Sequence, residues 1–193
     1  MRVSSVSALV APFAVFALTL PVIENGSLSL PSRSEPHCIN FPAVVAGAFV
    51  GPTAQNVASP SWNIADILRN VHEPRRGEIQ CWCAPSSATY VIIRVTKAVA
   101  SDTRTRSIVQ VYQAMTRHIA LEGDGLIGAA GYWAKTVAGL TIRVSNANNH
   151  QITWGVFASA LLALADYMRQ LGSAEVTFWV YDGPHEVGGG VID

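Results

Sequence analysis

The pattern that most constrains the fold is an apolar helix near the end of the 193-residue chain. Thr153 is a good helix N-cap and Gly172 a good helix stop. Between them, spacings of three and four residues separate the apolar positions Trp154, Phe157, Leu161, Leu164, Met168 and Leu171. From Ile152 to Ala165 there is no charged residue, and a run of 14 residues is too short to span a bilayer. A helix that is apolar on nearly every side is usually buried, so this pattern predicts a core helix.

A second amphipathic helix precedes it. Ser101 or Asp102 is the expected N-cap, and Gly123 is the expected stop. The apolar stripe of this helix consists of Ile108, Val111, Tyr112, Met115 and Ile119.

Strands are predicted on either side of both helices. β-branched residues predict a buried strand over Tyr90–Val95. The other expected strands are a region from Tyr132 to Val144 interrupted near Gly139, an alternating strand from Val176 to Tyr181, and a last strand from Glu186 to Ile192 after the turn Asp182–His185. The order β-α-β-α-β-β predicts an α+β domain over residues 77–193. Its two helices pack on one face of a mainly antiparallel sheet.

The N-terminus is typical of a secretory signal peptide. Arg2 is the only charge before Glu24, and the apolar segment Val3–Ile23 ends in polar residues. We therefore expect a signal peptide over residues 1–23, a secreted, extracellular product, and no stable membrane insertion after cleavage. The alternative is a signal-anchored membrane protein, since ~20 apolar residues suffice to span a bilayer.

Residues 24–76 are expected to form a loop-rich leader or pro-segment. Ser, Pro and Gly give this region the composition of a linker, and a short helix is predicted near residues 62–72. The apolar stretch Phe41–Gly51 could be a buried strand or part of a discarded propeptide. Arg75 and Arg76 resemble a kexin-type processing site, which requires two adjacent cations on an extended segment. Pro74 helps to keep this segment out of a helix. Cleavage there is expected to give a product from Gly77 to Asp193 and to remove Cys38.

The three cysteines are Cys38, Cys81 and Cys83. In a secreted chain a thiol with an available partner is normally oxidised. The spacing between Cys81 and Cys83 is too tight for an easy mutual disulfide. We therefore expect Cys38 to pair with one of the two. The other would then be free or link two chains in a disulfide-bonded dimer.

Charge is distributed unevenly along a chain whose formal net charge is zero. From Arg69 to Arg117 the net charge is +5, and from His118 to Asp193 it is −4. The basic part lacks the dense stripe with interleaved aromatics that nucleic-acid binders carry, so no nucleic-acid partner is predicted.

Two motifs suggest cofactor chemistry but fail on context. The run Gly123–Gly128 matches G-x-G-x-x-G, yet it follows a helix and precedes a strand, the reverse of the dinucleotide fingerprint. His118, Glu122 and Asp124 offer half a metal site and lack further ligands. No cofactor and no metal are therefore predicted.

Asp182, His185 and Glu186 crowd the final turn. With Cys81 or Cys83 as nucleophile they would make a Cys-His hydrolase, which is the alternative function. A polar cleft around His185 would favour the hydrolase. An exposed aromatic patch from Trp179 or Trp133 would favour binding.

The segment from Ile152 to Val156, with Asp182-Gly183 and Glu186–Gly188, resembles a region that recurs in small secreted fungal proteins of unknown function. The resemblance covers about the last 40 residues. It implies a secreted, effector-like protein and carries over no catalytic residue. Killer-toxin-like sandwiches of fungi share the broad α+β order but have more cysteines. The preferred hypothesis is a secreted binding or effector-like protein without catalytic activity, whose partner is a protein or a surface ligand.

Overall fold

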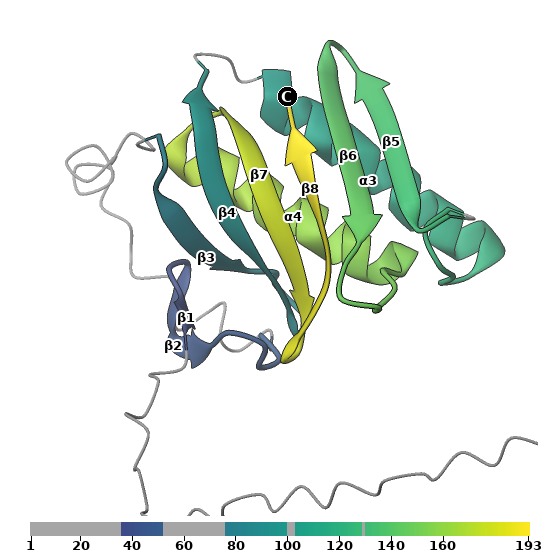
Figure 1. Ribbon diagram of the computed structural model, residues 1–193, viewed down its shortest axis with the longest axis horizontal. Coiled ribbons are helices and arrows are strands. Elements are labelled where there is room, and N and C mark those ends of the chain that lie inside the picture. The colour runs from purple at the N-terminus through teal and green to yellow at the C-terminus, as the bar shows by residue number, and fades with distance from the viewer. Residues whose placement is uncertain (1–35, 52–75, 100–102, 129) are drawn as a thin grey trace, which may run out of the picture. The chain divides into compact units, whose positions relative to one another are not determined.

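A computed structural model describes residues 36–51, 76–99, 103–128 and 130–193 (Figure 1). The expected signal peptide, the expected helix near residues 62–72 and Arg75 lie outside the described residues.

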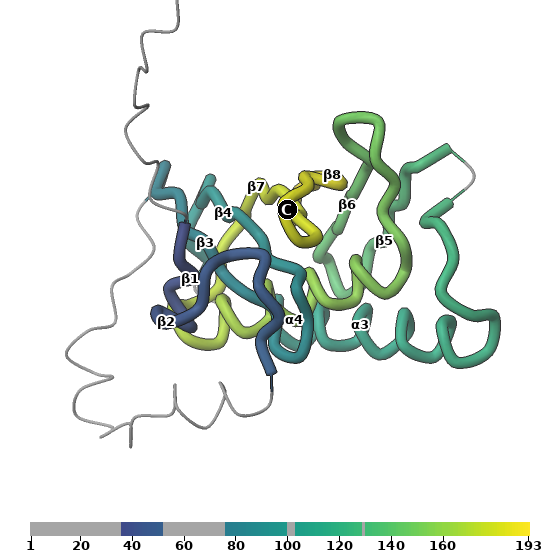
Figure 2. Tube along the Cα trace, turned by 90° about the horizontal axis from the view of Figure 1, so that it is seen from below, coloured from purple at the N-terminus to yellow at the C-terminus, as the bar shows by residue number. Residues whose placement is uncertain are grey.

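The described part is built on one six-stranded sheet with two helices packed against a single face (Figures 1 and 2). Every strand pairing in it is antiparallel. The strands, in their order across the sheet, are β3 (Ile79–Cys83), β4 (Thr89–Ala98), β7 (Ala174–Asp182), β8 (His185–Ile192), β6 (Leu140–Asn146) and β5 (Tyr132–Val137). The helices are α3 (Thr103–Glu122) and α4 (Trp154–Leu171). The predicted α+β class is confirmed.

Helix α4 forms where the sequence predicts it. The Thr153 hydroxyl accepts a hydrogen bond from the Val156 N–H (3.3 Å), and the Gly172 N–H donates to the Met168 carbonyl (3.0 Å). Nine of its residues are buried, because the helix packs both against the sheet and against α3 beside it.

Helix α3 covers the rest of the same sheet face. Its buried positions include Ile108, Val111 and Met115 from the predicted stripe. The helix stops at Gly123, whose φ of 88° suits glycine and whose N–H bonds the Ile119 carbonyl at 2.9 Å. Its expected caps, Ser101 and Asp102, lie outside the described residues.

The predicted strand region from Tyr132 to Val144 is a hairpin. The chain reverses between β5 and β6 at Ala138 and Gly139, both with positive φ. The final turn is also confirmed, since Asp182 and His185 face each other across a two-residue connection between β7 and β8.

A short hairpin covers the edge of the sheet at β3. It consists of β1 (His37–Cys38) and β2 (Phe41–Val45). The Ile39 N–H donates to the Cys81 carbonyl at 2.9 Å. The Asn40 side chain accepts from the Cys83 N–H (3.0 Å) and donates to the Cys83 carbonyl (2.9 Å). These bonds use backbone groups that an edge strand otherwise leaves open.

Residues 36–51 therefore pack with the domain, although their composition resembles a linker. Strand β3, which the sequence analysis did not predict, is the element on which this hairpin rests.

Candidate functional site

The two faces of the sheet differ in what covers them. The inner face carries Val176, Phe178 and Val180 of β7, all buried against the helices. The outer face carries the alternate residues Thr177, Trp179 and Tyr181. Hairpin β1–β2 covers one end of this outer face, and the described helices cover none of it (Figure 2).

Three sulfur atoms meet under the hairpin. Cys38 is bonded to Cys83, with their Cα atoms 5.5 Å apart, and Cys81 is a free thiol. Cys81 and Cys83 lie on the same face of β3 because strand side chains alternate. The sequence left two partners open for Cys38, and the structure selects Cys83. Cleavage after Arg76 would therefore not release Cys38 from the oxidised protein, which corrects that expectation.

Two stacked tyrosines adjoin the sulfur cluster. The rings of Tyr90 and Tyr181 are 4.7 Å apart, and the Tyr181 hydroxyl donates to Glu186 at 3.3 Å. Burial raises the pKa of Tyr90 to about 12, and burial together with Glu186 raises the pKa of Tyr181. Burial also raises the pKa of the Cys81 thiol to about 11. At neutral pH Cys81 is protonated, so it is a poor nucleophile.

The proposed hydrolase residues are near one another but are not arranged as a catalytic set. Asp182 and His185 are exposed on either side of the final turn, and Glu186 is bonded to Tyr181. Among the described residues, no hydrogen bond joins His185 to a carboxylate or a cysteine. Its ring instead lies 5.1 Å from that of His150.

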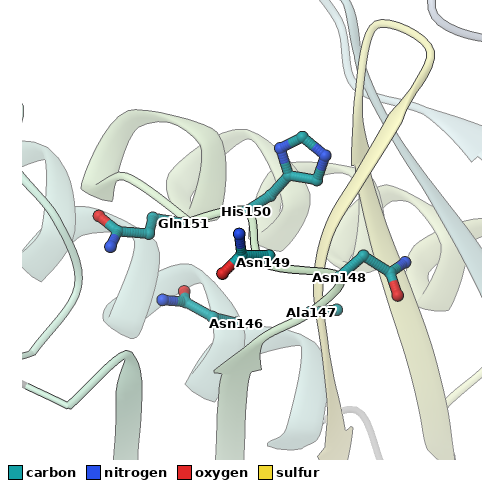
Figure 3. Close-up of a pocket in the computed structure, with 6 residues that line it drawn as sticks. All are labelled: Asn146, Ala147, Asn148, Asn149, His150 and Gln151. Carbon is teal, nitrogen blue, oxygen red and sulfur yellow. The ribbon is translucent and has the colours of Figure 1, made fainter. Parts of the chain in front are cut away.

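A small polar pocket lies beside this histidine pair. It has a volume of about 200 Å³ and is lined by residues 146–151 (Figure 3). Asn148 and Asn149 adopt positive φ, and the His150 N–H bonds the Ala147 carbonyl at 2.9 Å, so this segment is the predicted turn. Its lining side chains are amides, one alanine and one imidazole, which include no nucleophile. Drug-sized ligands usually occupy about 300–1,000 Å³.

The residues considered as half a metal site, His118, Glu122 and Asp124, make contacts within the fold. His118 Nδ1 lies 3.3 Å from a Glu122 carboxylate oxygen on α3. Asp124 turns away to the start of α4, where it accepts from the Gly155 N–H at 2.8 Å and from the Thr153 hydroxyl at 3.2 Å. The described residues include no group of three or more His, Cys, Asp or Glu placed to hold a metal. The glycine-rich run Gly123–Gly128 is a loop between helix and strand, as its context predicts.

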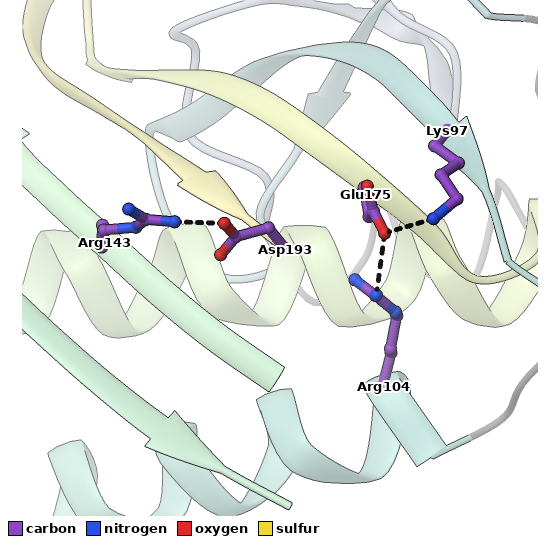
Figure 4. Close-up of polar contacts among 5 residues, drawn as sticks. All are labelled: Lys97, Arg104, Arg143, Glu175 and Asp193. Atoms are coloured by element: carbon purple, nitrogen blue, oxygen red, sulfur yellow. Dashed lines mark hydrogen bonds and ion pairs between the residues drawn. The ribbon is translucent and has the colours of Figure 1, made fainter. Parts of the chain in front are cut away.

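Ion pairs join the basic middle of the chain to its acidic end (Figure 4). Glu175 of β7 pairs with Lys97 of β4 at 3.2 Å and with Arg104 of α3 at 3.3 Å. A further pair, Arg143 with Asp193, lies within the acidic end itself. Part of the charge asymmetry along the sequence is therefore neutralised within the fold.

Arg94 is a basic side chain of the open outer face. Its guanidinium carbon lies 5.5 Å from the centroid of the Trp179 ring, a cation–π arrangement. Within the described ranges no carboxylate pairs with it. Ile79, the residue opposite Arg94 on β3, is 56% exposed, and Tyr132 on β5 is 52% exposed.

The other candidate aromatic, Trp133, contributes nothing to this face. It points to the helices, with its ring 5.1 Å from Phe157 and 6.4 Å from Trp154. The sequence analysis overlooked Arg94. The available signal was a single charge inside the otherwise apolar strand from Tyr90 to Val95.

The candidate processing bond lies at the border of the sheet. Arg76 is exposed, and the Gly77 N–H after it donates to the Val95 carbonyl of β4 at 2.9 Å. Arg75 lies outside the described residues.

No helix in the described part of the chain is long and apolar enough to cross a membrane. No protein-family model matches the chain, and no curated protein or solved structure matches it either.

Proposed function

We propose that the chain is a secreted binding protein without catalytic activity, and that it binds through the open outer face of the sheet. The observation that carries this proposal is the contact between Arg94 and Trp179, flanked by the exposed Ile79. Arginine and tryptophan are the side chains most enriched among residues that dominate binding energy. The two described helices lie on the other face (Figure 2), and Arg94 is exposed while Trp179 is half-buried.

The partner that fits this surface is a protein. Beyond the end that the hairpin covers, this face is a sheet surface, and a pocket on its described part, lined by residues including Tyr132, Arg143 and Gly189, has about 190 Å³. The Arg94 cation can pair with a carboxylate of the partner, and the Trp179 ring and the exposed Ile79 can contact an apolar side chain next to that carboxylate. We therefore infer an acidic protein surface as the partner.

Binding is tested with two charge-reversal variants. Arg94→Glu removes the cation on the sheet face, and Arg117→Glu makes the same change on the exposed side of α3. Each tagged protein is photo-crosslinked to surface proteins of candidate target cells, and the captured protein is identified and assayed in purified form. We expect Arg94→Glu to weaken binding about tenfold or more and Arg117→Glu to leave it unchanged. Equal effects of the two variants would contradict the proposed surface.

Secretion is supported by the signal-like residues 1–23 and by the Cys38–Cys83 disulfide, since disulfides persist in oxidising compartments. Expression in a yeast host, followed by intact mass and N-terminal sequencing of the medium, tests it. A product that begins near Glu24 supports a cleaved signal. Retention in the membrane fraction would favour the signal-anchored alternative. The effector-like role rests on the resemblance to small secreted fungal proteins.

Cleavage after Arg76 is part of the proposal in a revised form. The mature product would be two chains joined by Cys38–Cys83, with residues of the leader still covering the edge of β3. The non-reduced mass of a cleaved product would then exceed that of residues 77–193 alone. A product that consists only of residues 77–193 without reductant would overturn this form of processing.

A secreted hydrolase is the second candidate, favoured by the His150–His185 contact beside the polar pocket. If it is correct, His185→Ala abolishes turnover of ester or amide substrates while the exposed-site control Arg117→Ala keeps it. Absence of turnover above buffer across a substrate panel would reject it.

A further inference from the structure

The sulfur cluster holds a free thiol against a disulfide. Cys81 Sγ lies 3.5 Å from Cys38 Sγ, the sulfur that is bonded to Cys83. Both β3 cysteines face the hairpin, and the Ile39 N–H bond to the Cys81 carbonyl keeps the backbone after Cys38 beside Cys81. Cys38 is thus within reach of two thiols on one strand face.

We propose that Cys38, Cys81 and Cys83 form a thiol–disulfide exchange site, in which Cys38 alternates between the two cysteines of β3. Cys81 loses its proton to solvent, and the thiolate attacks Cys38 Sγ. The Cys81–Cys38 bond forms while the Cys38–Cys83 bond breaks. The electron pair passes to Cys83 Sγ, which takes up a proton. The number of disulfides is unchanged, so the step needs no external oxidant or reductant.

The exchange changes which thiol is accessible. In the observed isomer the free thiol is Cys81, which is partly exposed, whereas Cys83 is 1% exposed. In the other isomer the free thiol is the buried Cys83, so a reagent or a second chain finds no accessible thiol. The hairpin stays in place in both isomers, because Asn40 holds the backbone of Cys83 and not its sulfur.

The groups around Cys81 make the exchange slow at neutral pH. Among the described residues, Tyr90 and Tyr181 interact electrostatically with Cys81, and neither supplies a positive charge to stabilise a thiolate. Burial keeps the pKa of Cys81 at about 11, so the thiolate fraction rises about tenfold with each pH unit between pH 7 and pH 10.

Serine variants give the first test, read by non-reducing peptide mapping and thiol titration. We expect Cys83→Ser to contain a Cys38–Cys81 disulfide and no free thiol, and Cys81→Ser to keep Cys38–Cys83. The control Cys38→Ser should have two free thiols, because the remaining pair is too close along the strand to bond easily. A folded Cys83→Ser protein with two free thiols in a glutathione redox buffer would overturn the proposal.

The wild-type protein gives the second test and decides the matter if Cys83→Ser does not fold. The purified protein is incubated between pH 7 and pH 10, quenched in acid, unfolded in acidic guanidinium and labelled with a maleimide. We expect label to move from Cys81 toward Cys83 until a constant ratio is reached, about tenfold faster per pH unit. Label confined to Cys81 after prolonged incubation of folded protein at pH 10 would overturn the exchange.

Discussion

The indole N–H of Trp82 donates a hydrogen bond of 3.0 Å to the carboxylate of Asp166. Trp82 is 1% exposed on β3, and Asp166 lies on α4, so this bond ties the edge of the sheet to the central helix. The same carboxylate oxygen lies 3.5 Å from the Asn40 amide nitrogen of the hairpin. One side chain thus connects the helix, the edge strand and the β1–β2 hairpin.

Asp166→Ala is expected to destabilise the protein by about 1–3 kcal/mol, because it leaves the buried Trp82 N–H without its acceptor. The control Arg169→Ala removes a 73%-exposed partner of the same carboxylate and should cost less than about 1 kcal/mol. Urea unfolding followed by tryptophan fluorescence gives both values. Equal losses in the two variants would show that the Trp82 bond contributes little.

Gly190→Ala is expected to cost about 2–4 kcal/mol. An added Cβ would lie 2.7 Å from the Phe178 ring and closer still to the Arg143 carbonyl oxygen. That carbonyl belongs to β6, which pairs with β8, so it cannot withdraw without disturbing the ladder. Gly125→Ala is the matched control, since nothing lies within 4 Å of its added Cβ. Thermal unfolding of both variants checks this, and an unchanged Tm for Gly190→Ala would contradict the close packing.

Alkaline pH is expected to destabilise the protein through its buried tyrosines. Burial raises the pKa of Tyr90 and of Tyr167 from 10.0 to about 12. The unfolded state therefore loses these protons first as pH rises above 10, and it is favoured increasingly up to about pH 12. The stabilising contribution is fully present below pH 10. Denaturant unfolding between pH 8 and pH 11.5 should show a free energy of unfolding that declines above pH 10.

Tyr167→Phe isolates one of these groups. The Tyr167 hydroxyl is buried and has no hydrogen-bond partner among the described residues. Its removal should raise the free energy of unfolding by about 1 kcal/mol and weaken the alkaline decline. Tyr132→Phe, at a half-exposed position, should change neither. A loss of stability in Tyr167→Phe would indicate that the hydroxyl is hydrogen-bonded after all.

Cys81 is expected to react slowly with alkylating agents in the folded protein. Its pKa is raised from 9.0 to about 11, so its thiolate fraction near pH 8 is about one-hundredth of that of an ordinary thiol. The iodoacetamide rate should keep rising up to pH 10 or higher. The guanidinium-unfolded protein serves as control, and its rate should be half-maximal near pH 9 and level off above about pH 10. A folded protein whose rate, like that of the control, is half-maximal near pH 9 would contradict the burial of this thiol.

The predicted elements that the structure confirms are those with a strong local pattern. Helix α4 begins after Thr153 and ends before Gly172 because its caps and its apolar spacing are both written in consecutive residues. Strand β7 shows the predicted alternation for the same reason. Strand β3 was missed because it does not show the usual pattern of buried apolar and exposed polar residues: Ile79 is exposed and Gln80 is buried.

The candidate site depended on contacts between distant residues. Asn40 and Asp166 are 126 positions apart, and nothing local to either residue indicates their contact with each other. Arg94 and Trp179 meet because β4 pairs with β7. The two strands are separated by 75 residues, so the sequence near either strand does not indicate that they are neighbours. Of the two aromatic residues considered for an exposed patch, Trp133 packs against the helices instead, because side-chain direction on β5 follows the sheet register.

By itself, the sequence determined the α+β class, the limits of the core helix, the alternating strand β7 and the final turn, because these depend on periodicity, caps and turn residues within a few positions. Only the tertiary structure decided the strand order, the choice of Cys83 over Cys81 as the partner of Cys38, and the packing of residues 36–51 on the sheet edge. Those features depend on which surfaces meet after the chain has folded back on itself, and pairings across a sheet leave no periodic trace in either strand alone.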